Sequence, residues 1–520
     1  MVTRASLRVK SPFATPTSSR RTKKSGTFSI TSYFPVRKRG NSASPELYGK
    51  RRRRGATVLD AEFLSPEGIL PHATPLRYRF FGDQDEQEAG SSQEAAVGRN
   101  NVRSSTALGI FEDLPPGLFQ LMIDNLDIPC LISLGLSSSA WNAHVLNYVH
   151  SNLFLQRVLR ESTEFVNNGL NSVENFFTSV DPFYHYGKLL KSVSVCFPTS
   201  KRIATLMHFC DRVLAYEEID KFGVGRTIHT MCSKWAFPEC AKVLQAVLKR
   251  NNNRLQNALK RMSSSEAGSM PAVEMELRDN LRPLLLSGQS AEYDGADIEY
   301  MFWLSAVMHT VKEPIAQSKL LMILFGPAKC DGKEITIDWS LFCEHVIAPF
   351  KLTETLLKPL ADVLYLLLKT KKLENEKYLW SQHDVFNIIE ELTTTPEPWS
   401  FDNFVALLLH QTSLIPVSLI ARMNHDYADE ACLMFLTFMT TAYRWNMNVC
   451  EAIQQPILQT MRSLTRQRGR QFYDCICDQY ANMLKQLSSR GQDAAVELNI
   501  LLAAHAQAAP LLREMSTLLW

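Results

Sequence analysis

The chain has 520 residues, of which 45% are hydrophobic, 10% aromatic and 21% charged. This composition is typical of a globular protein and excludes a collagen-like, a disulfide-stapled or a wholly disordered chain. The formal net charge of +3 hides a strong segregation, because residues 1–54 hold 15 basic residues and one acid whereas the other 466 residues hold 41 basic and 52 acidic residues.

Residues 1–107 are rich in Ser, Pro, Gly and Arg and show no sustained periodicity, so we predict that this basic tail is disordered. It contains two basic clusters ten residues apart, which predict a bipartite nuclear-import signal read by an import receptor, and therefore a nuclear protein. The alternative use is a nonspecific DNA or RNA arm, and the two uses can coexist. The cluster residues are Arg37, Lys38, Arg39, Lys50, Arg51, Arg52, Arg53 and Arg54.

A second motif of the tail lies just before the first basic cluster. Ile30, Tyr33 and Phe34 have the spacing of an aliphatic residue followed by two aromatics, which one 3₁₀ turn would bring to the same side. The segment resembles the short peptide that binds the replication sliding clamp, with Thr27 in place of the usual Gln. The alternative is an apolar patch with no partner.

Residues 108–155 are predicted to form three short helices, the second after Pro129 and the third from Trp141. Apolar residues recur in the first helix at the spacing of one helical side, which predicts a single apolar stripe. A unit of this length buries little apolar surface by itself, so we expect the stripe to be available to a partner. The residues of interest are Leu114, Pro115, Leu118, Leu121, Met122, Leu126, Leu131, Leu134 and Trp141.

Residues 156–520 read as one amphipathic helix after another, so the fold class is all-α. Ser381 and Asp384 have the spacing of a capping box before an apolar helix. Gly326 to Lys333 is predicted to be a turn, and Glu334–Ile337 is the one strand candidate. An irregular, solenoid-like stack of helices and a compact multi-helix domain both remain open. Helices are expected at about 298–312, 314–325, 352–370, 400–411, 428–446, 450–467, 470–489 and 495–518.

The pattern of residues 112–141 resembles an F-box: Leu-Pro, a helix of apolar residues, a turn with Asp and Pro, Leu-x-x-Leu and a later aromatic. Downstream, the body from about Leu108 to near the C-terminus resembles the F-box only protein 47 family. The strings that carry this likeness are Phe302-Trp303-Leu304, Leu320 to Pro327, Trp339, Ile389 to Leu392 and Pro398-Trp399. The resemblance implies that the three-helix unit docks on the Skp adaptor of a cullin scaffold and that the helical body holds a substrate. It also implies a role with chromosome-associated proteins in germ cells or meiosis.

No catalytic constellation, cofactor motif or metal site is predicted. His208 with Cys210, and His229 with Cys232 and Cys240, lack the spacing of a zinc finger, and the eleven cysteines are scattered as in a reduced protein. The acidic pair Glu390-Glu391 is read as part of a solvated helix side. The apolar runs Ala431–Tyr443 and Leu360–Leu368 are shorter than the roughly 20 residues that cross a bilayer, so no membrane span is expected.

Two hypotheses follow. The first is a non-catalytic substrate receptor of a nuclear Skp–cullin–F-box E3 ubiquitin ligase, in which the RING subunit and its E2 perform the chemistry. The second is a chromosomal or telomeric scaffold that retains an F-box fold outside a ligase. The intact Leu114-Pro115 pair favours the receptor, whereas Gly117 and Ser137, which depart from the F-box pattern, favour the scaffold. The substrate itself is not identified by the sequence.

Overall fold

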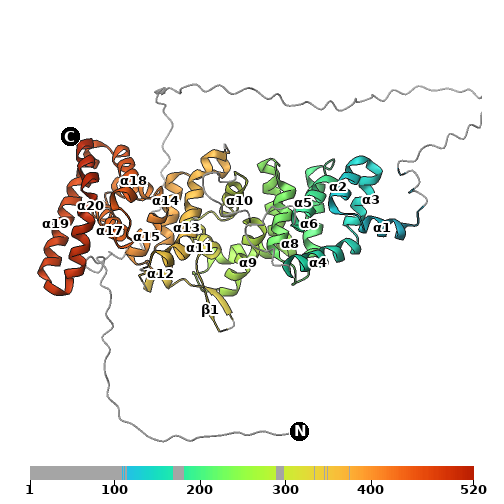
Figure 1. Cartoon of the computed structure of the whole chain (residues 1–520), viewed down its shortest axis with the longest axis horizontal. Coiled ribbons are helices and arrows are strands. Elements are labelled where there is room, and N and C mark those ends of the chain that lie inside the picture. Colours follow the sequence, from blue (N-terminus) through green and yellow to red (C-terminus); the bar gives the residue numbers. More distant parts are fainter. Residues whose placement is uncertain are drawn as a thin grey trace, which may run out of the picture. The chain divides into compact units, whose positions relative to one another are not determined.

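The structure is a computed structural model that describes residues 108, 111, 114–167, 181–287 and 298–520, except 333, 345, 348 and 374. These described residues belong to one compact unit, and almost all of its secondary structure is helical, as predicted (Figure 1). The predicted disordered tail lies outside the described residues. The predicted boundary at residue 155 falls inside a helix, α4 (Asn152–Asn167).

The helices pack mainly with the helix two places along the chain, which produces two rows. The first row consists, in order, of α5, α7, α9, α11, α14, α16, α18 and α20. The second row consists, in order, of α4, α6, α8, α10, α13, α15, α17 and α19. Each helix thus buries its apolar side against its own row and the facing row. This arrangement is the irregular helical stack that the sequence left open, with the same element repeated along one direction.

The first half of the chain supplies three short helices and the beginning of the two rows. The bounds are α1 (Pro116–Asp124), α2 (Ile128–Ser137), α3 (Ser139–Val149), α4 (Asn152–Asn167), α5 (Pro182–Val193), α6 (Thr199–Val213), α7 (Lys221–Cys232), α8 (Phe237–Ser264) and α9 (Pro271–Leu285). Helix α2 packs on α5, where the small Gly135 lies against Val193, so the first three helices are attached to the rows.

The second half continues the rows. The bounds are α10 (Ile298–Met308), α11 (Pro314–Phe325), α12 (Leu341–Glu344), α13 (Phe350–Lys369), α14 (Gln382–Leu392), α15 (Phe401–His410), α16 (Leu414–Asn424), α17 (Ala428–Arg444), α18 (Val449–Ser463), α19 (Arg466–Ser489) and α20 (Ala495–Leu519). Three 3₁₀ turns join them: η5 (Thr370–Leu373), η6 (Glu376–Tyr378) and η7 (Gly491–Ala494). Helix α16 was not predicted, whereas the expected helices over this half are present with shifted ends.

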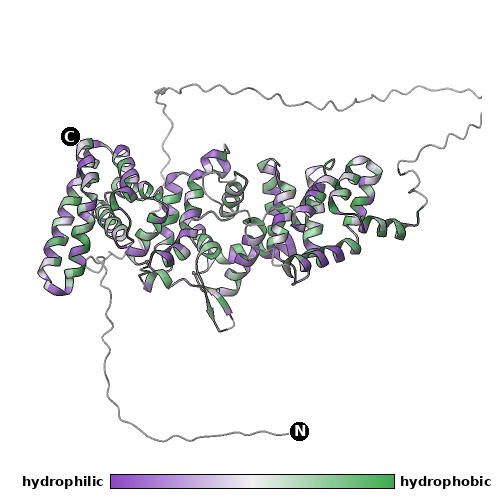
Figure 2. Cartoon of the chain, viewed as in Figure 1, coloured by the Kyte–Doolittle hydropathy of each residue, from purple (hydrophilic) through white to green (hydrophobic). Residues whose placement is uncertain are grey.

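The core runs without interruption through both rows, and the middle of the chain lies deepest in it. Residues 300–308 of α10 and 316–324 of α11 are all buried, so these helices have no solvent-facing polar side. Helices nearer the ends alternate hydrophobic and hydrophilic residues along their length (Figure 2). The capping box before α14 is confirmed, because the Asp384 N–H donates to Ser381 Oγ and the Ser381 N–H donates to Asp384.

A small β-hairpin extends from the helices near α9 and α12 (Figure 1). Strand β1 (Ala328–Asp331) pairs antiparallel with β2 (Glu334–Ile337), which packs on α9. The prediction of β2 is confirmed, whereas the predicted turn over Gly326 to Lys333 is too long, because four of its eight residues form β1 and the chain turns only after them. The hairpin turns at Gly332, whose φ is +69°.

Candidate functional site

The three short helices α1, α2 and α3 begin at local signals that the sequence supplies. Pro115 precedes α1 as its N-cap, and the Asp127 carboxylate accepts a hydrogen bond from the Cys130 N–H at the start of α2, at 2.9 Å. At the start of α3 the Ser138 hydroxyl accepts from the Trp141 N–H at 3.2 Å. These two side-chain caps satisfy free N–H groups at the starts of α2 and α3, whereas α1 has no side-chain cap and begins with a proline in its first turn.

Helix α1 has two apolar sides rather than the one stripe that was predicted. Phe119 and Ile123 point into the core, with 6% and 1% of their surface exposed. Leu118 and Leu121 lie on the other side and remain 56% and 49% exposed. Large apolar side chains that no described residue covers mark an interaction surface.

The other predicted site residues are distributed between this surface and the core. Pro115 is exposed, Leu131 is completely buried, and Leu114, Met122, Leu126 and Leu134 are partly buried against the core. Trp141 is partly buried, its ring stacked on Phe119 at 5.5 Å and edge-on to Phe111 at 5.4 Å between ring centroids. Of the nine residues, Pro115, Leu118 and Leu121 are therefore the most accessible to a partner. Leu136 on α2 is 58% exposed and was not predicted.

A buried arginine holds α1 against the first helix of the stack. Arg157 of α4 is 7% exposed, and its Nη1 donates to the carbonyl oxygens of Asp124 and Leu126 at 3.1 and 2.6 Å. These carbonyls lie at and just beyond the C-terminal end of α1, where intrahelical partners are lacking. Arg157 Nε also pairs with Glu161 at 2.6 Å. The cation thus fixes the end of α1 and was not identified from the sequence.

Two tyrosines connect the Arg157 contacts to α3 and to α5. The Tyr148 hydroxyl of α3 donates to the Asp124 carboxylate, and the Tyr186 hydroxyl of α5 donates to Glu161. Burial, and then the hydrogen-bonded carboxylate, raise the pKa of Tyr148, and the same two causes raise that of Tyr186. Both phenols therefore stay neutral donors at physiological pH. Helices α1, α3, α4 and α5 are joined in one polar network.

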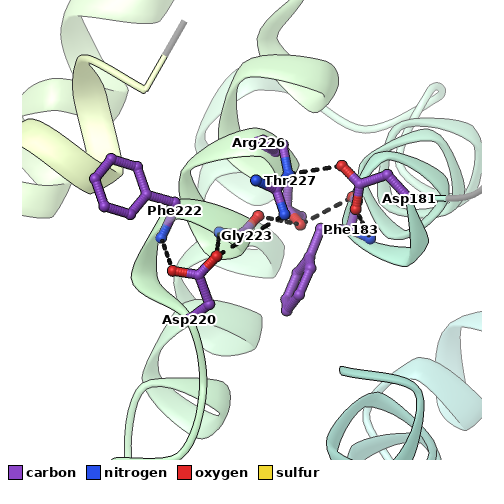
Figure 3. A network of polar contacts seen from close by, with 7 residues as sticks. All are labelled: Asp181, Phe183, Asp220, Phe222, Gly223, Arg226 and Thr227. Atoms are coloured by element: carbon purple, nitrogen blue, oxygen red, sulfur yellow. Dashed lines mark hydrogen bonds and ion pairs between the residues drawn. The ribbon is translucent and has the colours of Figure 1, made fainter. Parts of the chain in front are cut away.

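A second buried network joins α5 and α7 (Figure 3). Asp181 accepts from the Phe183 N–H at 3.0 Å as the cap of α5, and its other oxygen pairs with Arg226 Nε of α7 at 2.6 Å. Burial outweighs the Arg226 charge and raises the pKa of Asp181. Asp220 caps α7 by accepting from the N–H groups of Phe222 and Gly223.

Close backbone approach accompanies this ion pair. Thr227 Oγ1 donates to the Phe183 carbonyl at 3.0 Å, and a Cβ added at Gly225 would lie 2.0 Å from the Pro283 carbonyl oxygen of α9. Both partners of the ion pair are buried and the helices around it touch. We interpret this network as structural, because its buried ion pair and hydrogen bonds join α5 to α7 and the close approach at Gly225 joins α7 to α9.

Comparison with known proteins gives two independent results. The family model described as "FBXO47, ARM repeats" matches residues 251–519, just over half of the chain. F-box only protein 47 of Homo sapiens is 23% identical over 423 residues, which cover 78% of this chain and 88% of the human protein. The Mus musculus protein of the same name is 23% identical over 422 residues, with the same coverage. The chain belongs to the F-box only protein 47 family.

The family assignment agrees with the resemblance seen in the sequence and divides the chain at α8. The repeat model begins at Asn251, inside an interruption of α8 at Arg250 to Asn253. The three asparagines there have positive φ angles of 49°, 57° and 62°, a left-handed conformation that Asn tolerates better than most residues. The repeats of this F-box family thus start midway along the two rows, and α1 to α7 precede them.

The remaining titratable clusters are structural. Among the described residues, no group of three or more His, Cys, Asp or Glu side chains is placed to hold a metal ion. His229 stacks edge-on against Trp303 at 5.3 Å, and Cys232 and Cys240 are buried with free thiols. The reading of Glu390 as solvated was wrong, because Glu390 pairs with the buried Arg422 of α16.

Among the described residues one segment reaches the length and apolar composition of a membrane span, although none was expected from the sequence. Gly491–Leu519 is long and apolar enough to cross a bilayer, because its few charges are interspersed with Ala and Leu. Its residues Leu501, Ala504 and Leu511 are fully buried, and α20 packs on α17, α18 and α19. We therefore assign this helix to the family's repeat stack.

The predicted tail sites lie outside the described residues. They are the import clusters Arg37 to Arg39 and Lys50 to Arg54 and the clamp-like peptide with Ile30, Tyr33 and Phe34. Both remain predictions.

Proposed function

We propose that this F-box protein is the substrate-recognition subunit of a nuclear Skp–cullin–F-box E3 ubiquitin ligase. In this proposal α1 and its neighbours dock on the Skp adaptor, which is attached to the cullin, and the helical rows hold the substrate. The observation that carries the proposal is the exposed apolar side of α1 at Leu118 and Leu121 in a chain of this family.

The physical argument for docking is the combination of exposure and rigidity. The side chains of Leu118 and Leu121 are each about half exposed. A partner that covered them would gain roughly 25 cal/mol of binding free energy for each Å² of apolar surface removed from water. The Arg157 network fixes the end of α1. A docking helix that is already ordered loses less conformational freedom on binding.

The role of such a receptor in ubiquitination is positional. The chain would bring a substrate lysine close to the E2 that the RING subunit holds, and proximity of this kind converts an encounter between two molecules into a step within one complex. We therefore propose no catalytic residue in this chain.

The decisive experiment is co-purification of the Skp adaptor and the cullin with the tagged chain from cells. The test variant is Leu118→Glu with Leu121→Glu, which places charge on the exposed side of α1 without entering the core. The matched control is Val195→Glu with Val496→Glu, two apolar residues that are 60% and 69% exposed elsewhere. We expect the wild type and the control to recover both proteins and the test variant to recover at least tenfold less.

The alternative is a chromosomal or telomeric scaffold that retains the F-box fold outside a ligase. Gly117 supports it, because a glycine in the first turn weakens a helix by up to about 1 kcal/mol relative to alanine. If neither the wild type nor the control recovers the adaptor, the ligase proposal fails and the scaffold becomes the leading function.

We further propose that the protein acts in the nucleus, on chromosome-associated proteins in germ cells or meiosis. The two basic clusters of the tail support nuclear import, and the family resemblance suggests the tissue and the substrate class. The test is the location of the fluorescently tagged chain with Lys50 to Arg54 replaced by glutamine. A nuclear signal that persists in this variant and in one lacking both clusters would contradict the import proposal.

A further inference from the structure

Helix α8 carries a concentration of positive charge that the acidic body does not share. Its segment from Cys240 to Ser264 contains six basic residues and no acid, although residues 55–520 as a whole have 11 more acids than bases. The basic residues are Lys242, Lys249, Arg250, Arg254, Lys260 and Arg261. The excess of positive charge is therefore a local property of this helix and not of the whole body.

Two of the six cations are neutralised by neighbouring helices. Arg250 pairs with Asp211 of α6, and Arg254 pairs with Glu276 of α9. Lys242, Lys249, Lys260 and Arg261 are exposed and form no ion pair with any residue that the structure describes. We call these four the α8 cations.

The α8 cations all lie on the solvent side of the helix. Val243 and Val247 are buried, and Lys242 and Lys249, two turns apart, point away from them by the geometry of 3.6 residues per turn. After the interruption, Leu255 and Leu259 are buried, and Lys260 and Arg261 flank the opposite side. In each half, therefore, the cations lie opposite that half's own buried side, and the interruption at Arg250 to Asn253, whose three asparagines are exposed, joins the two halves.

The interruption adds hydrogen-bonding groups between the two pairs of cations. Asn251, Asn252 and Asn253 are exposed, and each amide side chain carries both donors and an acceptor. A peptide backbone offers the complementary donors and acceptors. The surface thus combines charge at both ends with amides in the middle.

We infer that the outer side of α8 is the docking surface for an acidic peptide segment of a partner protein. The inference rests on the proposed function, because that partner would be the substrate. Unpaired exposed cations attract an acidic segment over about one Debye length, which is roughly 10 Å at 0.1 M salt.

A peptide fits these observations better than a nucleic acid. A long duplex would extend beyond α8 over a body that is net negative and would be repelled there. A single strand usually stacks its bases on aromatic side chains, and residues 238–265 contain no Phe, Tyr or Trp. A short acidic peptide meets only the basic surface.

The test uses zero-length crosslinking, in which a carbodiimide joins carboxylates to lysine amines, on the purified full-length chain without the adaptor. The probe is a synthetic peptide of alternating Glu and Ser, and the products are mapped by mass spectrometry. Lys351, Lys371, Lys372 and Lys485 are exposed lysines of the same chain and serve as internal controls. Mapping by residue also separates α8 from the basic tail.

We expect Lys242, Lys249 and Lys260 to crosslink at least tenfold more than the control lysines, and 0.5 M salt to remove this preference. Equal crosslinking of all exposed lysines would overturn the inference. So would displacement of the peptide from α8 by oligothymidylate at a lower concentration than by unlabelled peptide, which would assign the surface to nucleic acid.

A second measurement separates this inference from the proposed function. The variant Lys242→Glu, Lys249→Glu and Arg261→Glu keeps Lys260 as the reactive amine. It is compared with a control in which Lys351, Lys371 and Lys372 become Glu, so that both variants change the net charge equally. We expect adaptor recovery to be the same in both and crosslinking at Lys260 to fall at least tenfold only in the first. Crosslinking at Lys260 that is unchanged in the first variant would overturn the inference, whereas loss of adaptor recovery with retained crosslinking would count against the proposed function alone.

Discussion

The contact of Arg157 with the end of α1 makes a quantitative prediction about the stability of the F-box. In Arg157→Met the stem of the side chain is kept, but the hydrogen bonds to Asp124 and Leu126 and the pair with Glu161 are lost. Truncating one partner of a buried ion pair costs about 3 to 5 kcal/mol. Glu161 is 27% exposed, so water replaces part of the interaction and we expect the lower end, about 3 kcal/mol.

The assay is amide hydrogen exchange resolved by mass spectrometry, because a chain of this length does not unfold in one step and local opening is the relevant quantity. A loss of about 3 kcal/mol corresponds to exchange that is roughly a hundredfold faster in peptides from α1 and α2. Amides of α17 report the distant stack and should not change. Adaptor recovery should fall in parallel.

The matched control is Arg160→Met. Arg160 is another arginine of α4 and lies about one helical turn after Arg157. Arg160 is exposed, and a surface substitution of this kind is usually within about 0.5 kcal/mol. Exchange in α1 within threefold of wild type in both variants would refute the reasoning, since the contacts of Arg157 would then not stabilise the F-box.

Three further changes test the packing. Gly117→Ala adds a Cβ with no atom within 4 Å and should stabilise α1 by up to about 1 kcal/mol, which slows amide exchange in α1; faster exchange there would contradict this. Gly225→Ala places its Cβ 2.0 Å from the Pro283 carbonyl oxygen and should cost more than about 2 kcal/mol, so unchanged amide exchange in α7 and α9 would show that these helices can separate. Burial lowers the pKa of His229 to about 4, so the folded state favours the neutral imidazole. The contribution of His229 to the free energy of unfolding is therefore fully present above pH 6.5, and up to about 3 kcal/mol of it is lost as the pH drops from 6.5 to 4. Denaturation of His229→Gln across that range should show a shallower loss, and an identical slope would contradict the assignment.

Several features of the fold could be predicted because the information is local. The Ser381 and Asp384 capping box depends on residues three apart, and the bounds of α11 at Pro314 and Phe325 follow from a proline and an apolar run. The strand Glu334–Ile337 was also predicted, as the one strand candidate after a turn. Its partner β1 was not, because a strand is defined by pairing with another segment and the Gly326 to Asp331 residues carry no strand pattern of their own.

The all-α class, the F-box pattern around Leu114-Pro115 and the apolar character of α1 could be read from the chain before folding, since they depend on residue type and helical spacing. Tertiary structure decided which apolar residues face outward: Leu131 is in the core, whereas Leu118 and Leu121 remain exposed. It also decided that Arg157, 31 residues from Leu126 in sequence, fixes the end of α1. A helical pattern specifies which residues share a side, but burial and long-range ion pairing depend on which other helices pack there, and that is a property of the folded chain alone.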